Sequence, residues 1–184
     1  PLVPEFHQKI FAKKNLNLVV LNIGGISNFT FLDGKDNFYG SDCGPGNALM
    51  DIYCQKFLNR PYDKNGKHAR DGEVHLPSLN KMLSHPFFKK RHPKSTGKEI
   101  FNIGFIPTQL LQKSSADILA TLTELTAIVI TKSLRSLQGK PDKVIVCGGG
   151  IKNTFLVRSI EKHIKSTIIS TSEYGFNPQA IEAM

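Results

Sequence analysis

Three glycine-rich turns, each placed after an apolar segment, constrain this chain most. They are Asn22-Ile23-Gly24-Gly25-Ile26-Ser27-Asn28, Ser41-Asp42-Cys43-Gly44-Pro45-Gly46-Asn47 and Cys147-Gly148-Gly149-Gly150. Glycine allows backbone N–H groups to approach a bound anion without an intervening side chain. The middle turn also carries an acid, Asp42, at its tip, just before an apolar helical segment. Together the turns predict a backbone shaped around phosphate, with a carboxylate beside it.

Length and composition limit the class of protein. A chain of 184 residues with 40% hydrophobic residues can fold as one domain, or as one lobe of a larger protein. No apolar run approaches the roughly 20 residues that span a bilayer, and Pro1–His7 is unlike a signal peptide. Cys43, Cys54 and Cys147 are odd in number and widely spaced, which argues against a disulfide framework or a zinc site. We therefore expect a cytoplasmic protein that does not contact membranes.

The net charge of +9 raises the question of an anionic partner. The basic residues are scattered, as in Lys13-Lys14 and Lys89-Lys90-Arg91, rather than ordered on one helix face with aromatic residues between them. We interpret them as a solvated basic surface, with attraction of an anionic small ligand as the alternative, and expect no nucleic-acid partner. The histidines form no H-x-E or H-E-x-x-H grouping and are interpreted as surface or structural residues. The lack of a G-x-S-x-G sequence disfavours a serine hydrolase.

Hydrophobic periodicity predicts an α/β fold. Strands are expected at residues 16–23, 26–32, 38–41, 143–147 and 167–171. Helices are expected from residue 47 to about residue 57, at 76–84, 99–101, 115–137 and 153–164, and from residue 178 onward. Ser115 is expected to cap the longest helix. Residues 59–72 are polar and are interpreted as a long loop.

Each candidate site residue also has an ordinary structural explanation. Gly24-Gly25, between two strands, is most often a simple turn. Gly148-Gly149-Gly150 either admits a phosphate or allows a helix to pack closely on a strand, and it matches neither the P-loop nor the dinucleotide-binding glycine pattern. Asp42 either satisfies backbone groups in its turn or acts as a general base. Asp51 is expected on the helix surface or in a local hydrogen bond.

Taken together, these segments resemble one family, the anhydro-N-acetylmuramic acid kinases, which are sugar kinases of the actin-like ATPase superfamily. The resemblance runs from end to end in the family's order. Its blocks are Pro1–Pro4 with Phe6-His7, Leu21–Asn28 (LNIGGISN), Asp42–Asp51 (DCGPGNALMD), Arg60–Asp63 (RPYD), Pro93–Glu99 (PKSTGKE), Ala120–Ala127 (ATLTELTA), Val146–Gly150 (VCGGG) with Asn153, and Glu182–Met184 (EAM).

The resemblance implies a fold of two actin-like (ribonuclease H-like) lobes with ATP and sugar in the cleft between them. Residues 1–184 look like the C-terminal lobe alone, an α/β unit with a mixed sheet flanked by helices. The N-terminal lobe, with the first phosphate loop, and the extreme C-terminus are then absent from this chain. The chain by itself is expected to be inactive and to bind nucleotide weakly. A homodimer of the whole protein is compatible with the resemblance.

The resemblance also implies a reaction. Water opens the 1,6-anhydro bridge of anhydro-N-acetylmuramic acid, and the γ-phosphate of ATP goes to O6, which gives N-acetylmuramic acid 6-phosphate within cell-wall recycling. Asp42 matches the family's catalytic aspartate, and Glu182 matches a glutamate that helps to hold the amino sugar. The implied nucleotide-binding residues are Gly24, Gly25, Asn28, Gly148, Gly149, Gly150 and Asn153. ATP and Mg²⁺ are the expected cofactors, and the sequence identifies no Mg²⁺ ligand.

One departure from the family pattern lies beside the acid. The family usually has threonine where this chain has Cys43, so a hydroxyl donor is lost near Asp42; if that hydroxyl touches phosphate, rate or nucleotide affinity should fall modestly. Two other functions are weighed. A non-catalytic nucleotide-binding regulatory module would leave Asp42 and the Lys94–Gly97 turn without a shared purpose. Transfer of phosphate to a carboxylate, as in acetate kinase, is disfavoured by the sugar-specific blocks.

Overall fold

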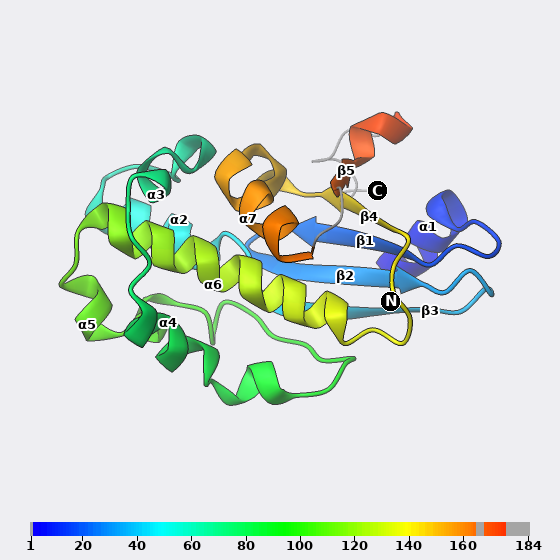
Figure 1. Cartoon of the computed structure of the whole chain (residues 1–184), viewed down its shortest axis with the longest axis horizontal. Coiled ribbons are helices and arrows are strands. Elements are labelled where there is room, and N and C mark those ends of the chain that lie inside the picture. Colours follow the sequence, from blue (N-terminus) through cyan, green and yellow to red (C-terminus); the bar gives the residue numbers. More distant parts are fainter. Residues whose placement is uncertain (1, 165–167, 176–184) are drawn as a thin grey trace.

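The computed structural model describes residues 2–164 and 168–175 (Figure 1). Its centre is a five-stranded mixed sheet in the order β3-β2-β1-β4-β5. The strands are β1 (Leu18–Ile23), β2 (Ile26–Leu32), β3 (Phe38–Pro45), β4 (Lys143–Cys147) and β5 (Ile168–Ser170). The pairs β1–β2 and β2–β3 are antiparallel, and the pairs β1–β4 and β4–β5 are parallel. The predicted α/β fold with a mixed sheet flanked by helices is confirmed.

The helices cover both faces of the sheet. They are α1 (Leu2–Phe11), α2 (Ala48–Phe57), α3 (Lys67–Arg70), α4 (Leu76–Leu83), α5 (Thr108–Leu111), α6 (Ser115–Arg135) and α7 (Thr154–Ile164). Short 3₁₀ turns lie at Lys64–Gly66, Pro86–Lys89, Ile103–Phe105, Gly149–Lys152 and Thr171–Tyr174. In Figure 1 the long helix α6 crosses the near face of the sheet beside α7, and α1 lies behind it.

Most predicted elements are present, and the differences have local causes. The N-cap of α6 is Ser114 rather than Ser115, because the Ser114 side chain accepts a hydrogen bond from the amide of Asp117 (3.1 Å). Residues 99–101 form a turn rather than a helix. The expected loop 59–72 contains a 3₁₀ turn and α3, since both carboxylate oxygens of Asp63 bind the amides of His68 and Ala69 (3.0 Å each). The helix expected from residue 178 lies outside the described residues.

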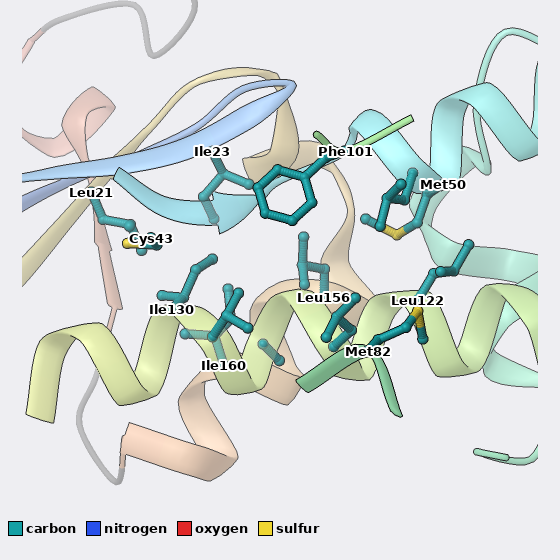
Figure 2. Packing of buried hydrophobic residues seen from close by; sticks show 14 of the residues in the cluster. Leu21, Ile23, Cys43, Met50, Met82, Phe101, Leu122, Ile130, Leu156 and Ile160 are labelled. Carbon is teal, nitrogen blue, oxygen red and sulfur yellow. The ribbon is translucent and has the colours of Figure 1, made fainter. Parts of the chain in front are cut away.

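Alternation along the strands divides the core into two parts. Odd-numbered residues of β1 (Val19, Leu21, Ile23) pack toward α6 and α7, and even-numbered ones (Leu18, Val20) pack toward Phe11 of α1. Figure 2 shows Leu21 and Ile23 directed toward the buried side chains of α6 and α7. A sheet fixed from both faces holds the ends of its strands in place, and the glycine turns lie at these ends. Within the described part of the chain, no helix is long and apolar enough to cross a membrane.

Candidate active site

The carboxylate of Asp42 is held from one side. Asp42 lies within β3, the edge strand of the sheet, and not at the tip of a turn as its glycine neighbours suggest. Its Oδ2 accepts a hydrogen bond from the amide of Thr96 (2.8 Å) and another from the hydroxyl of Ser95 (3.3 Å). Among the residues that the structure describes, none donates to Oδ1. One oxygen therefore fixes the orientation of the carboxylate and the other is left for a ligand.

The segment that holds Asp42 adds itself to the open edge of β3. The amide of Asp42 donates to the carbonyl oxygen of Lys94 (2.9 Å), and the amide of Lys94 donates to Ser41 Oγ (2.9 Å). Ser41 Oγ also lies 2.6 Å from His92 Nδ1. Burial, with a smaller effect of the Lys94 charge, lowers the pKa of His92 to about 4, so its ring is neutral at neutral pH. The backbone pairing of Lys94 with β3 therefore fixes the positions of Ser95 and Thr96, which follow it in the chain.

Asp42 lines a cavity of about 610 Å³, called here the Asp42 cavity. Asn28 on β2 lies beside Asp42 in the strand register and lines the same space. His7 of α1 lines it as well, with Nδ1 2.9 Å from Thr30 Oγ1. The buried Nε2 of His7 has no hydrogen-bond partner among the described residues, and burial lowers the pKa of His7 to about 4. The cavity therefore combines a carboxylate, an amide and a neutral imidazole, which is a set of groups suited to sugar hydroxyls.

The Gly24-Gly25 turn is attached to the start of α2. The amide of Asn47 donates to the Gly24 carbonyl (2.8 Å), and those of Gly46 (2.9 Å) and Ala48 (3.0 Å) donate to the Gly25 carbonyl. A Cβ on Gly46 would overlap the carbonyl oxygen of Gly24, so this position requires glycine. The amides of Gly46, Asn47 and Ala48 are therefore occupied by the Gly24-Gly25 turn and are not available to an anion.

Lys98 supplies a positive charge beside the Gly24-Gly25 turn. A Cβ on Gly25 would lie 3.3 Å from Lys98 Cε and 4.0 Å from Lys98 Nζ, so the ammonium stem passes directly over the turn. Lys98 belongs to the same segment as Ser95 and Thr96, which hold Asp42. This segment thus positions the Asp42 carboxylate and also places the Lys98 side chain beside the Gly24-Gly25 turn. In the sequence, this lysine is marked only by its place in a family block, and no role is predicted for it.

The glycines of the third turn have different structural roles. Gly148 has φ +86°, and a Cβ there would meet the Asn22 side chain and the backbone of Ile23; a Cβ on Gly150 would overlap the Ile23 side chain. Both glycines are therefore required for packing against the end of β1, as the structural alternative supposed. Gly149 is exposed, and a Cβ there would have no atom within 4 Å. Gly149 is thus the glycine of this turn that leaves free space for a ligand.

A second cavity, of about 430 Å³, lies beside this turn and is called here the Asp51 cavity. It is lined by Gly149 and Gly150, by Asn47 just before α2, by Asp51 of α2, and by Asn153. Asp51 was expected on the helix surface or in a local hydrogen bond. It is half-buried, and burial raises the pKa of its carboxyl to about 6 against an opposing effect of Lys98. The Asn153 side-chain oxygen accepts from the amide of Leu156 (3.1 Å), so Asn153 caps α7 and its NH₂ group can donate to a ligand.

Cys43 does not lie beside the Asp42 carboxylate, although the two residues are adjacent in the sequence. Strand alternation turns its side chain to the face opposite Asp42, where it is fully buried beneath α6, as Figure 2 shows. Burial raises the pKa of the thiol to about 12, so Cys43 is a neutral core residue. Cys43, Cys54 and Cys147 are all buried and free of disulfides. Glu182, the expected sugar contact, lies outside the described residues.

The parallel pairing of β1 and β4 brings the candidate residues to one edge of the sheet. Asn22 is in register with Cys147, so the Gly24-Gly25 turn and the Gly148–Gly150 turn emerge side by side. Ligands bind at this carboxyl edge in open α/β sheets. Asp42 and Asn28 share the Asp42 cavity, and Gly149, Gly150 and Asn153 share the Asp51 cavity. His7 and Asp51 were missed as candidates because only the fold shows that they line cavities.

Comparison with known proteins decides the family. The family model "Anhydro-N-acetylmuramic acid kinase" matches residues 1–184. The chain belongs to this family. It is 43% identical over 184 residues to the anhydro-N-acetylmuramic acid kinase of Gamma-proteobacterium EBAC31A08, and 41% identical over 187 residues to that of Hydrogenovibrio crunogenus. Each alignment covers 100% of this chain and 50% of the relative, so the chain spans about half the length of these anhydro-N-acetylmuramic acid kinases.

Solved structures agree with the fold. The activator of 2-hydroxyisocaproyl-CoA dehydratase from Clostridium difficile, solved with bound ADPNP, aligns with a TM-score of 0.58 at 16% identity, over 98% of this chain and 61% of its own. Xylulose kinase from Lactobacillus acidophilus aligns with a TM-score of 0.57 at 10% identity, over 98% of this chain and 43% of its own. The chain therefore shares the fold of these two proteins.

Proposed function

We propose that this chain is the C-terminal lobe of an ATP-dependent kinase that opens 1,6-anhydro-N-acetylmuramic acid and phosphorylates its O6. In this reaction water adds to C1 while the C1–O6 bond breaks, and a proton of the water passes to Asp42. The released O6 attacks the γ-phosphorus of ATP, and ADP leaves. The product is N-acetylmuramic acid 6-phosphate, and the reaction belongs to cell-wall recycling. The observation that carries this proposal is the Asp42 carboxylate, which lines the Asp42 cavity with Oδ2 held by Ser95 and Thr96 and with no donor to Oδ1 among the described residues.

The fixed carboxylate supports a general-base role. A base must lie within hydrogen-bond reach of the proton it takes and in the right orientation. Ser95 and Thr96 hold the carboxylate in one orientation through Oδ2. Asn28 and His7 line the same cavity and would bind sugar groups there. These residues orient the anhydro sugar and Asp42 accepts the proton.

The neighbouring turns support nucleotide binding at the same sheet edge. The open face of Gly149 and the Asn153 amide would accept the nucleoside, and Lys98 beside Gly25 would approach the phosphates. Mg²⁺ usually binds through one or two carboxylates together with phosphate oxygens and water. Asp51 fits this chemistry, because its half-buried carboxylate lines the Asp51 cavity and would be stabilised by a nearby cation. Bound Mg²⁺ would neutralise charge on the transferred phosphate.

Activity would require the remainder of the protein. Because the chain covers half of its relatives' length, we propose that a second lobe closes over both cavities and excludes water from the phosphate. The isolated chain would bind nucleotide weakly and would not turn over.

The test is ADP release by the full-length protein with ATP, Mg²⁺ and the anhydro sugar, compared with ordinary N-acetylmuramic acid and glucosamine derivatives. We expect release only with the anhydro sugar. Asp42→Asn should lower kcat roughly 10²- to 10⁴-fold while leaving the melting temperature and nucleotide affinity near those of the wild type. Asp36→Asn, on the exposed β2–β3 turn, is the matched control and should be fully active. Nucleotide binding without turnover on any sugar would instead support a regulatory module.

A further inference from the structure

A groove of about 670 Å³ lies on the other side of β3 from the Asp42 cavity. Tyr39 and Cys43 line this groove, whereas Gly40, Ser41 and Asp42 line the Asp42 cavity. Strand alternation places Gly40 and Asp42 on the face opposite Tyr39 and Cys43. Its remaining walls come from the segment after Phe87 and from the C-terminal half of α6. We call it the basic groove. The reaction proposed above assigns no role to the lysine and arginine side chains that line this groove.

Positive charge converges on this groove. The cations that line it are Lys89, Lys90, Arg91, Lys94 and Lys132. No aspartate or glutamate is among its lining residues. In the described part of the chain, the ion pairs are Lys9 with Glu5 and His163 with Glu124, and both lie elsewhere. Like charges gathered around a concave surface without counter-charges repel one another, and the field between them attracts an anion.

Lys94 shows the effect of this crowding. It is partly buried, its Nζ donates to the carbonyl oxygen of Phe87 (3.3 Å), and it lies over the Phe87 ring at 4.6 Å from the centroid. Burial is the main cause that lowers the pKa of Lys94, and the charge of Lys90 lowers it further. An anion in the groove would relieve both effects, because it would replace lost solvation and offset the repulsion between the two lysines.

We propose that the basic groove is a second ligand site, which binds a phosphate-bearing small molecule separately from the nucleotide and sugar. A phosphate group offers several oxygens to several cations at once, and the planar guanidinium of Arg91 matches two of them. The volume is that of a small-molecule site and suits a ligand of about the size of one nucleotide or sugar phosphate. This is the anionic small ligand that the net charge left as an alternative.

The groove adjoins the segment that positions Asp42. Pro93 and Lys94 line both the groove and the Asp42 cavity. The Lys94 carbonyl oxygen accepts the amide of Asp42. A ligand that binds Lys94 in the basic groove therefore contacts the same residue whose backbone pairs with Asp42 in β3. The ligand proposal itself rests on the groove and remains if the kinase reaction is wrong.

The test is calorimetric titration of pyrophosphate into the full-length protein at low salt, with a non-hydrolysable ATP analogue kept at saturation to occupy the nucleotide site. Wild-type protein should bind pyrophosphate saturably, and added salt should weaken binding. The variant Lys89→Gln/Arg91→Gln/Lys132→Gln should raise the Kd roughly tenfold or more. The matched control, Lys13→Gln/Lys14→Gln/Lys35→Gln, removes the same charge from exposed positions elsewhere and should leave the Kd unchanged.

Four outcomes would overturn the proposal. They are an absence of saturable binding, equal affinity in the wild type and the groove variant, and equal weakening by the groove and control variants. The fourth concerns the class of ligand. Tighter binding in the groove of the dicarboxylate succinate, or of a short oligonucleotide, than of pyrophosphate would exclude a small phosphate ligand. Failure of the ATP analogue to bind would count against the kinase proposal and leave the groove measurement valid.

Discussion

The amide of Thr96 donates a hydrogen bond of 2.8 Å to Oδ2 of Asp42, across 54 positions of sequence. The Ser95 hydroxyl reaches the same oxygen at 3.3 Å. Hydrogen bonds to a carboxylate are stronger than those between neutral groups, and these two fix the rotation of the Asp42 side chain. The orientation of the proposed base therefore depends on a segment that the chain reaches only after α4.

Ser95→Ala should lower kcat on the order of fivefold, because it removes one weak, partly exposed hydrogen bond to the carboxylate. KM for ATP should stay unchanged, since Ser95 lines the Asp42 cavity and not the Asp51 cavity. Ser95→Thr keeps the hydroxyl and should recover most of the rate. Steady-state kinetics of the full-length protein measure both. A loss that Ser95→Thr does not recover would assign the effect to the backbone of the segment.

Much of this site could be predicted from the sequence, because its turns are marked by glycine. The end of β3 could not be predicted. Gly44, Pro45 and Gly46 indicate a turn in the sequence, whereas β3 continues to Pro45 in the structure. The strand continues because β2 pairs with it on one side and Lys94 on the other. With the strand extended, alternation alone would have placed Cys43 on the face opposite Asp42. The roles of His7 and Asp51 depend on long-range packing, which local periodicity does not contain.

The third turn allows a comparison between neighbouring glycines. Gly150→Ala should destabilise the protein by about 1–3 kcal/mol, because the new methyl group overlaps the Ile23 side chain. Gly149→Ala meets no atom within 4 Å and should leave the free energy of unfolding nearly unchanged, while it weakens nucleotide binding by occupying the open face. Urea unfolding and nucleotide titration of both variants measure this. Equal destabilisation by the two substitutions would contradict the assigned roles.

Asp51 should make stability fall as the pH rises. Burial raises the pKa of its carboxyl in the folded state from the ordinary 3.8 to about 6, so between these values the folded state binds more protons than the unfolded state. Ionisation of Asp51 thus costs stability above pH 6, by about 1 kcal/mol once solvent screening at this half-exposed position is allowed for. Asp51→Asn should be more stable than the wild type at pH 7.5 and should lose this advantage at pH 4.5. The urea midpoint at the two pH values measures it.

Binding of ATP with Mg²⁺ separates a functional role of Asp51 from a structural one. A metal ligand at this position should be reflected in the Mg²⁺ dependence of ATP binding, and Asp51→Asn should raise the Mg²⁺ concentration needed for half-maximal activity. Asp36→Asn serves again as the exposed control. An unchanged Mg²⁺ requirement in Asp51→Asn would remove Asp51 from the metal site and leave its effect on stability intact.

His7 should have the opposite pH dependence. Burial lowers the pKa of its ring from 6.5 to about 4, so the unfolded state binds the extra proton first, and stability is lost as the pH falls from 6.5 toward 4. His7→Gln has no titrating group and should show a smaller loss, by about 1 to 2 kcal/mol, over this range. His7 lines the Asp42 cavity, so the same variant should raise KM for the anhydro sugar and leave KM for ATP unchanged. A rise in both KM values, or in neither, would make His7 a structural residue that only supports Thr30.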